Sequence, residues 1–352
     1  MILKKFNQYY KRFDVVLRDT DKKPFIQLVF EAIHFGIKKR EFPFFYFGKY
    51  LYRRGVNNYN KFLSSKEVDS ITLSKVLHNP VYKPLLRNKL IFYNYLKHFN
   101  TSIVKIIGYN FKRKFYAFSN NSAQVDLIRI DVNFFLNTLL SRSKKHSVFM
   151  KPIDDMGGSH CYILDQNFIE SNLCFLTNIL LEGCFIFQER IIQHKRINEL
   201  YSQSVNSIRF DSYLDDNDRI HILSAFMRFG TGGAFVDNSS AGGIYVPIDI
   251  EKGILMKHSF QLMQYGGASL KSHPDSGKKF EGFEIPFFTQ SCILIKELVR
   301  LIPDKLIGWD IAITPDGPVA IEGNDNNSMI GPDIAYGGYL DHPMFSEILM
   351  KI

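Results

Sequence analysis

Helical and strand-like patterns of apolar residues alternate along the whole chain. Apolar residues recur at helical spacing in the segments 25–37, 85–99, 132–140, 170–181 and 290–301. Short apolar or alternating runs, typical of strands, occupy the segments 103–109, 115–118, 147–151, 161–164, 184–188 and much of 204–263. The strand-like runs come in close pairs, which favours antiparallel pairing, and helices separate the pairs. The pattern therefore predicts the α+β fold class and not a doubly wound parallel sheet.

The clearest single element is a strand pair in the segment 307–328, which reads IGWDIAITPDGPVAIEGNDNNS. Its centre, TPDGP, is turn chemistry, because proline restricts φ and glycine permits a positive φ. Folding the segment about Asp316 places Asp310 opposite Glu322, with Asn324 on the same face. The opposite, apolar face would then carry Trp309, Ile311, Ile313, Val319 and Ile321.

Two carboxylates at this spacing predict a bound cation. Side chains directly opposite each other in a strand pair lie about 5 Å apart, so Asp310 and Glu322 repel unless a positive charge lies between them. Magnesium prefers carboxylate and amide oxygens and leaves coordination positions open to water and phosphate. Asp310, Glu322 and Asn324 are therefore candidate metal ligands. The alternative is a solvent-exposed hairpin whose acidic residues bind no ion.

Length and composition indicate an ordinary globular protein. The chain has 352 residues, of which 45% are hydrophobic and 22% charged, enough for one large domain or two to three small ones. Its four cysteines show no C-x-x-C spacing, so we expect reduced core residues of a cytoplasmic protein. The first residues lack the apolar region of a signal peptide, and no run of about 18 apolar residues predicts a transmembrane helix.

A net charge of +9 favours an anionic partner, which could be a phosphate-rich ligand, a membrane surface or nucleic acid. The sequence contains no zinc-finger or RNA-binding motif and its basic residues are dispersed, so we do not expect nucleic acid binding. The first fifty residues combine Lys and Arg with many Phe and Tyr. They form either an aromatic packing segment or a site of peripheral attachment to a membrane or a membrane-bound partner.

Two segments are candidate nucleotide contacts. Lys151 ends an apolar strand and precedes a loop with Gly157 and Gly158, where backbone N–H groups and an ammonium group could bind an anion. The alternative is a plain hairpin loop with an exposed lysine. Farther along, an apolar strand turns polar at Gln188 and Glu189, where backbone groups could bind an adenine ring. Many strands simply end in polar residues, so this second pattern alone is not specific.

A third group of polar residues follows in strand-like runs. Arg209 lies in SVNSIRF, and Arg228 lies in AFMRFG, shortly before an Asp237-Asn238 pair and the glycines Gly242 and Gly243. Arginines beside such turns suit the binding of phosphate or of a developing oxyanion. The alternative is a pair of structural ion pairs and a turn. No Ser/His/Asp or Cys/His arrangement emerges from the spacing, so covalent nucleophilic catalysis has no support.

The order of these pieces resembles the ATP-grasp superfamily, and most closely its sugar-transfer-associated family. The resemblance rests on VNSIRF, on RFG followed by VDNSSAGG, on HPDSG, and on IGWDIAI followed by GPVAIEGN. It covers residues 85–343 and implies an ATP-grasp fold, in which two α+β subdomains clamp a nucleotide. We expect the nucleotide clamp at about 145–192 and the metal-binding subdomain at about 193–343, preceded by a helical, basic and aromatic segment at 1–84.

The resemblance also implies roles for individual residues. Asp310, Glu322 and Asn324 would bind magnesium, with Glu322 bridging two ions. Lys151 and Lys89 would contact the phosphates of ATP, and Arg209 and Arg228 would face the transferring phosphate and the acyl group. Gln188, Glu189 and Ile191 would hold the adenine edge. One position departs from the pattern: many ATP-grasp ligases have an arginine two residues before the first metal-binding acid, where this chain has Gly308.

These expectations predict a cytoplasmic ATP- and magnesium-dependent carboxylate–amine ligase that acts through an acyl phosphate. Its substrate would be a small molecule or glycan precursor, because members of the family lie among genes for surface polysaccharides. Association with the inner face of the membrane or with a glycosyltransferase is a further expectation. The alternatives are a kinase that stops at the phosphorylated product and a nucleotide-binding scaffold without turnover.

Overall fold

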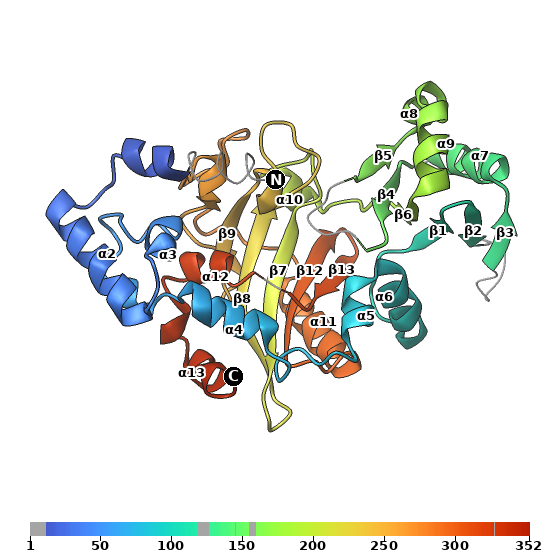
Figure 1. Cartoon of the computed structure of the whole chain (residues 1–352). Helices are drawn as coiled ribbons and strands as arrows, with labels where there is room; N and C mark the ends of the chain where they lie inside the picture. The colour runs from blue at the N-terminus through green and yellow to red at the C-terminus, as the bar shows by residue number, and fades with distance from the viewer. Residues whose placement is uncertain (1–11, 119–126, 145, 155–159, 327) are drawn as a thin grey trace.

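A large antiparallel sheet forms the centre of the protein and a smaller sheet lies beside it (Figure 1). The computed structural model describes residues 12–118, 127–144, 146–154, 160–326 and 328–352. The large sheet has the order β10-β9-β8-β7-β12-β13, and β11 also pairs with β9. These strands are β7 (Ser207–Leu214), β8 (Ile220–Phe229), β9 (Ile244–Asp249), β10 (Ile254–Leu255), β11 (Phe260–Gln261), β12 (Leu306–Thr314) and β13 (Gly317–Asn324).

Apolar side chains on the two faces of the large sheet bury different helices. On one face, Ile208 and Trp309 belong to a core with α11 (Phe288–Leu301) and α6 (Lys89–Leu96). On the other face, α4 (Ser65–Leu73) and α13 (Pro343–Met350) share a core with Leu223 and Leu306. Short helices lie between the strands, namely α10 (Lys195–Asn198), η3 (Ser239–Ala241) and η4 (Met263–Tyr265), and two more follow the last strand, α12 (Ile330–Ala335) and η5 (Tyr339–Asp341).

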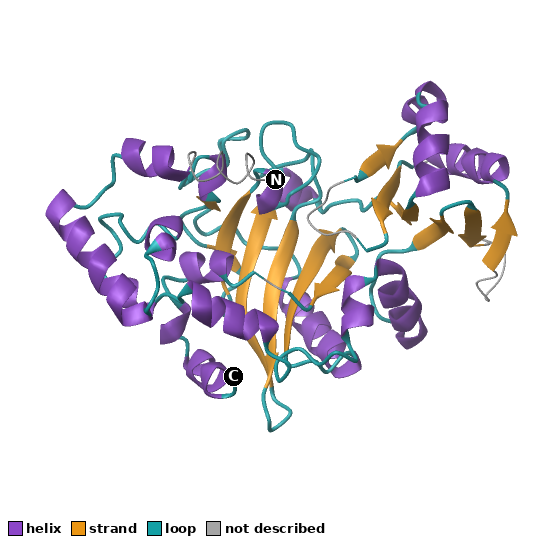
Figure 2. Cartoon of the chain, viewed as in Figure 1, coloured by secondary structure: helices purple, strands orange, loops and turns teal. Residues whose placement is uncertain are grey.

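The small sheet has a core of its own. Its strand order is β3-β2-β1-β6-β4-β5. The helices α7 (Val132–Ser143), α8 (Gln166–Ser171) and α9 (Leu173–Glu182) lie beside this sheet (Figure 2), and their apolar residues share its core. The strands are β1 (Ile106–Phe111), β2 (Lys114–Phe118), β3 (Leu127–Ile130), β4 (Val148–Pro152), β5 (Tyr162–Leu164) and β6 (Cys184–Glu189). The small subdomain therefore reaches back to Ile106, beyond the predicted clamp at about 145–192.

The N-terminal part is helical, as predicted, and packs against the large sheet subdomain. It contains α2 (Phe25–Lys39), α3 (Phe44–Gly48) and η1 (Tyr59–Lys61), whose aromatic residues form a core with Met263 and Ile334. Lys49 is buried and its Nζ lies 2.5 Å from the carboxylate of Asp333 in α12. This ion pair joins residues 284 positions apart in the chain. Among the described helices, none has both the length and the apolarity needed to cross a membrane.

The α+β prediction is confirmed by these two antiparallel sheets and their helices, but two predicted helices are interrupted. The segment 85–99 forms α5 (Lys83–Arg87), α6 and η2 (Lys97–Phe99), with a break at Asn88. Asn88 has an extended backbone, and its side-chain oxygen accepts hydrogen bonds from the backbone N–H groups of Leu90 and Ile91. Asparagine is a favoured N-cap because it satisfies these amides. The segment 170–181 is also broken, at Asn172 between α8 and α9, but there the asparagine side chain makes no capping hydrogen bond.

The C-terminal hairpin has the predicted pairing of Asp310 with Glu322, but it also has a bulge. The register shifts between Asp310 and Ile311, so that Ile311 pairs with Ala320. A one-residue shift reverses the face to which side chains point. Ala320 therefore belongs to the core instead of Val319 and Ile321, and Ile321 faces the cavity described below. The predicted composition of the apolar face was wrong at these two positions.

Candidate active site

A cavity of about 410 Å³ lies between the two sheets. The small sheet contributes residues of β4, β5 and β6, and the large sheet contributes residues of β7, β8, β12 and β13. Ten of the twelve predicted site residues line it: Lys89, Lys151, Gln188, Glu189, Ile191, Arg209, Arg228, Asp310, Glu322 and Asn324. Gly157 and Gly158 lie outside the described residues. Residues from segments more than 200 positions apart thus meet in one place, while their individual roles stay predictions.

Asp310 lies at the centre of the cavity between two arginines. Arg209 is its neighbour across the β7–β12 pair, with Nε 2.5 Å from Oδ1 and Nη2 3.0 Å from Oδ2. Arg228 on β8 places Nη2 2.9 Å from Oδ2. Burial by itself would raise the pKa of Asp310, but the two guanidinium groups outweigh it and lower that pKa to about 2. The same carboxylate raises the pKa of Arg209 against the effect of burial.

Ser207 and Asp237 hold Arg228 from its other side. Nη2 of Arg228 donates to Ser207 Oγ at 2.5 Å, and Ser207 Oγ donates to Asp237 Oδ2 at 2.5 Å. Oδ2 of Asp237 also accepts from the Ser207 amide at 2.7 Å and lies 3.6 Å from Nε of Arg228. Burial raises the pKa of Asp237, although Arg228 opposes this. A continuous polar network therefore runs from Asp310 through Arg228 and Ser207 to Asp237.

Ser207 was not evident as a site residue from the sequence, and Asp237 was evident only as part of the turn after Arg228. The sequence contained one indication for Ser207, because this residue shares a strand face with Arg209 when side chains alternate. The side-chain contacts of Asp237 could not be inferred, because they depend on how the turn after β8 folds back over β7.

Two lysines face Glu322 across the cavity. Nζ of Lys89, at the start of α6, lies 4.0 Å from Oε2 of Glu322. Lys151 on β4 is buried and forms no ion pair with any described residue. Burial lowers the pKa of Lys151, Glu322 opposes that shift and Lys89 adds to it. A desolvated ammonium group of this kind gains most when an anion enters beside it.

The hairpin oxygens fit a magnesium ion only in part. Glu322 and Asn324 carry a carboxylate and an amide oxygen on the cavity side, and hard cations prefer such ligands. The Asn324 amide nitrogen donates to the Gly308 carbonyl at 3.4 Å, so its Oδ1 is the atom left for a ligand. Both oxygens of Asp310 already accept from arginines. Within the described residues there is no cluster of three His, Cys, Asp or Glu suited to a metal. Glu322 and Asn324 are therefore better placed for a metal than Asp310.

The part of the cavity beside the end of β6 suits a flat ring. β6 ends at Glu189, and the amides of Glu189 and Arg190 donate to the carbonyls of Lys105 and Ser147. The Ile191 amide donates to no described residue and Ile191 lines the cavity, so this N–H is available to a ligand. Apolar side chains form the adjoining walls: Val104, Phe149, Pro152 and Ile163.

The charge of the cavity is positive overall. Six of the described lining residues are basic and four are acidic. Basic walls in a low-dielectric cleft attract polyphosphates. The cavity thus combines apolar walls, two lysines and an arginine–carboxylate cluster.

The segment His273–Phe280, which contains the HPDSG motif, contributes no residue to the lining. His273 is buried, its Nε2 lies 3.0 Å from the Gly230 carbonyl, and its ring stacks on Tyr201. The segment is thus anchored beside β8 by packing.

Comparisons with known proteins found one family model and several similar solved structures. A family model described as "Sugar-transfer associated ATP-grasp" matches residues 72–344. Among solved structures, the ATP-grasp ligase PsnB complexed with a minimal precursor matches at 11% identity and a TM-score of 0.44, covering 78% of this chain and 64% of that one. The ADP complex of purK, an N5-carboxyaminoimidazole ribonucleotide synthetase, matches at 9% identity and a TM-score of 0.40, covering 70% and 46%.

A third similar structure is a RimK domain ATP-grasp protein from Sphaerobacter thermophilus, at 11% identity and a TM-score of 0.40, covering 73% of this chain and 67% of that one. The chain thus spans less than two thirds of the length of the first two structures. No curated protein matches the chain. The family model covers well over half of the sequence, including every described site residue. The chain therefore belongs to the sugar-transfer associated ATP-grasp family and has the ATP-grasp fold.

Proposed function

We propose that the protein is an ATP- and magnesium-dependent carboxylate–amine ligase that works through an acyl phosphate. One observation carries the proposal. The cavity between the sheets brings an apolar end with a free amide, two lysines, two hairpin oxygen ligands and a pair of arginines into a single space. Family membership supports the use of ATP.

In this reaction, the residues of the small sheet bind the nucleotide. The Ile191 amide and the neighbouring apolar walls hold the adenine, while Lys89 and Lys151 bind the phosphates. Glu322 and Asn324 would hold magnesium, which offsets charge on the β- and γ-phosphates. Because Lys151 is buried with a lowered pKa, bound phosphate restores a favourable environment for its charged form.

The arginines of the large sheet act at the transferring phosphate. A carboxylate oxygen of the substrate attacks the γ-phosphorus, the bond to the ADP oxygen breaks, and an acyl phosphate forms. An amine then attacks the acyl carbon, and inorganic phosphate leaves with the bonding electrons. Arg228 and Arg209 stabilise the charge that develops during transfer, because Asp310, Ser207 and Asp237 hold them in place. Together these two arginines would replace the arginine that many ATP-grasp ligases have at the position of Gly308.

The family description supports a sugar-related substrate, so we propose a glycan precursor or its amino-acid substituent in surface polysaccharide synthesis, in the cytoplasm. Partners in the same synthesis, including a glycosyltransferase, are part of this proposal. ADP release by the purified protein, measured with uronic acids and amino acids as substrates, tests turnover. Hydroxylamine traps an acyl phosphate as a hydroxamate and so separates a ligase from a kinase. ATP turnover with a stable phosphorylated product and no hydroxamate would contradict the ligase chemistry, and no turnover with any pair would favour a scaffold.

A further inference from the structure

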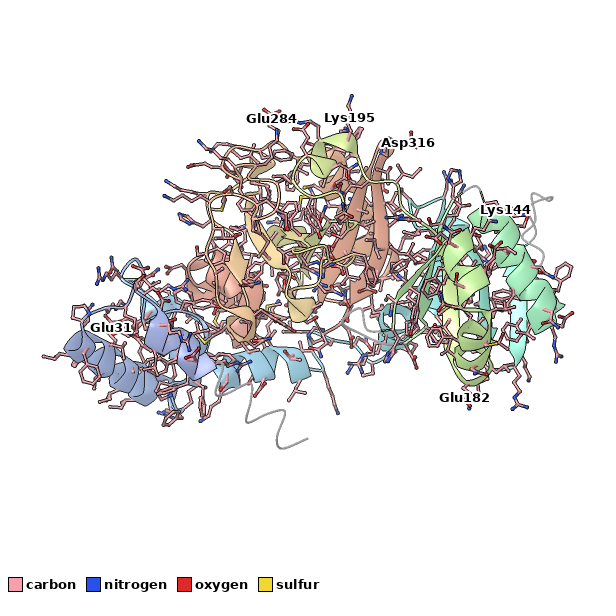
Figure 3. All side chains as sticks on the ribbon, turned by 90° about the horizontal axis from the view of Figure 1, so that it is seen from above. Glu31, Lys144, Glu182, Lys195, Glu284 and Asp316 are labelled. Atoms are coloured by element: carbon pink, nitrogen blue, oxygen red, sulfur yellow. The ribbon has the colours of Figure 1, made fainter. Side chains whose placement is uncertain are left out.

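The helix α2 is apolar on the side that faces solvent. Ile26, Phe30, Ile33 and Ile37 follow one another at spacings of four, three and four residues and form one stripe. The turn after the helix adds Phe42 and Phe44, whose ring centroids lie 4.7 Å apart. These six residues, here called the α2 surface, are 57% to 84% exposed. Figure 1, where α2 is labelled, and Figure 3, where its residue Glu31 is labelled, both show this helix at the outer edge of the molecule, far from the small sheet.

One charged residue of α2, Glu31, is turned inward. Glu31 is buried, and its carboxylate accepts from Nζ of Lys23 at 2.5 Å and from the Tyr46 hydroxyl at 2.9 Å. A helix that only covers a core has the reverse arrangement, with its apolar stripe inside and its charges outside. The fold therefore anchors α2 through a buried ion pair and presents its apolar stripe outward as a rigid surface.

The extent of the α2 surface exceeds that of ordinary exposed patches. With about 200 Å² for each large side chain, the exposed fractions amount to roughly 800 Å². The largest apolar patch of a typical monomeric protein covers about 300–600 Å², and larger patches mark interaction surfaces.

The excess of basic over acidic residues lies in the N-terminal segment that carries this surface. Fourteen of the 44 Lys and Arg residues, but five of the 35 Asp and Glu residues, lie in the first 61 residues. The net charge of this segment, +9, equals that of the whole chain, so the remainder is neutral. Lys38 and Arg40 are exposed between the helical stripe and Phe42, and neither forms an ion pair with a described residue. The apolar surface is thus bordered by unpaired positive charge.

From this combination, we propose that the α2 surface docks on an anionic lipid bilayer. Helices that lie in the membrane interface insert an apolar face with Phe and Ile and place Lys and Arg beside the headgroups. Each basic residue at such a surface strengthens binding by about fivefold when anionic lipids are present. The inference rests on residues outside the cavity and is independent of the proposed ligase chemistry.

The same residues disfavour a second copy of the chain and a protein partner. In a symmetric dimer each patch meets itself, which would bring the basic borders of both copies together. Protein interfaces also use about one hydrogen bond per 100–200 Å². The polar side chains on the outer part of α2 are already engaged, Gln27 with Glu31 at 2.8 Å and His34 with the Tyr59 hydroxyl at 2.7 Å. A bilayer requires no such partner.

Co-sedimentation of the full chain with vesicles tests the proposal. One set of vesicles contains phosphatidylcholine alone and the other also contains phosphatidylglycerol. We expect binding to the anionic vesicles that weakens as salt is added. The double variant Ile26→Ser with Phe30→Ser should bind the anionic vesicles at least about tenfold more weakly, because two inserted apolar side chains are lost. Lys38→Gln with Arg40→Gln should weaken binding to the anionic vesicles alone.

The matched control replaces two apolar residues elsewhere, Leu73→Ser with Val81→Ser, which are exposed to a similar degree at 79% and 72%. This variant should bind vesicles as the wild type does, and all variants should keep the wild-type melting temperature. Two results overturn the proposal. One is a folded wild-type protein that binds neither vesicle, which leaves a protein partner for the surface. The other is a lipid-independent dimer, seen by light scattering, that Ile26→Ser with Phe30→Ser dissociates.

Discussion

Replacing Arg228 by methionine should remove most catalysis while leaving nucleotide binding nearly intact. Arg228 contacts Asp310 at 2.9 Å and Ser207 at 2.5 Å, so the change deletes one of two guanidinium groups at the centre of the cavity. Loss of one contact that stabilises developing charge typically costs about 3–4 kcal/mol, which predicts a fall in kcat of about 100- to 1000-fold. KM for ATP should change far less, because the charge develops only during transfer.

The same variant should lose a limited amount of stability. The pKa of Asp310 is lowered from 3.8 to about 2, so its ion pairs stabilise the folded protein at neutral pH by an amount on the order of 2 kcal/mol. This contribution is present above pH 3.8 and is lost as the pH falls toward 2. Arg209 keeps its two bonds to Asp310 in the variant, so we expect about 1–3 kcal/mol of destabilisation, less than for a fully orphaned buried charge.

The assay is ADP release at varied ATP concentration, with circular dichroism and thermal melts for each protein. Arg228→Lys keeps the charge but not the paired geometry and should fall between the wild type and Arg228→Met. Arg219→Met, an exposed arginine away from the cavity, is the control. A folded Arg228→Met protein with near-normal kcat would refute the electrostatic role.

Three other changes test separate parts of the account. Glu322→Gln should abolish magnesium-dependent ADP release with the fold intact. The change keeps the volume of the side chain but removes the hairpin carboxylate that forms no ion pair with a described arginine. Turnover close to that of the wild type would show that Glu322 is not a metal ligand. Lys151→Met should weaken binding of ADP and of a non-hydrolysable ATP analogue in calorimetry, and unchanged affinity for both would show that its ammonium group binds no phosphate. Asp304→Asn should stabilise the protein at neutral pH by about 1–3 kcal/mol, because burial raises the pKa of Asp304 from 3.8 to about 6. The folded state favours the protonated form of Asp304, so the stability of the wild type declines as the pH rises from 3.8 through 6. Urea unfolding curves that show the same decline for Asp304→Asn would contradict this prediction.

Local patterns in the sequence were sufficient for the hairpin and for most helices and strands. Turn chemistry around Asp316 and the alternation of polar residues place Asp310 opposite Glu322, and the structure has that pair. The bulge could not be predicted, because Ile321 has the same apolar character whether it faces the core or the cavity. The break at Asn88 was also hidden, since apolar residues continue at helical spacing on both sides of it.

Contacts between distant segments lay beyond the reach of such patterns. Arg209 and Asp310 are 101 positions apart, and they meet because β7 pairs with β12, although four other strands lie between these two in the chain. The orientation of α2 was equally inaccessible, since a helix with apolar residues on both faces does not show which face is buried. Sequence reasoning identified the candidate residues, whereas the sheet order determines which of them touch.

A crystal structure of the protein with ADP and manganese tests the central claim most directly. Manganese accepts the same oxygen ligands as magnesium and gives an anomalous signal. The account predicts a manganese peak beside Glu322 and Asn324, the diphosphate against Lys89 and Lys151, and the adenine ring within reach of the Ile191 amide. A nucleotide bound outside the cavity, or a metal with no ligand from the hairpin, would contradict it.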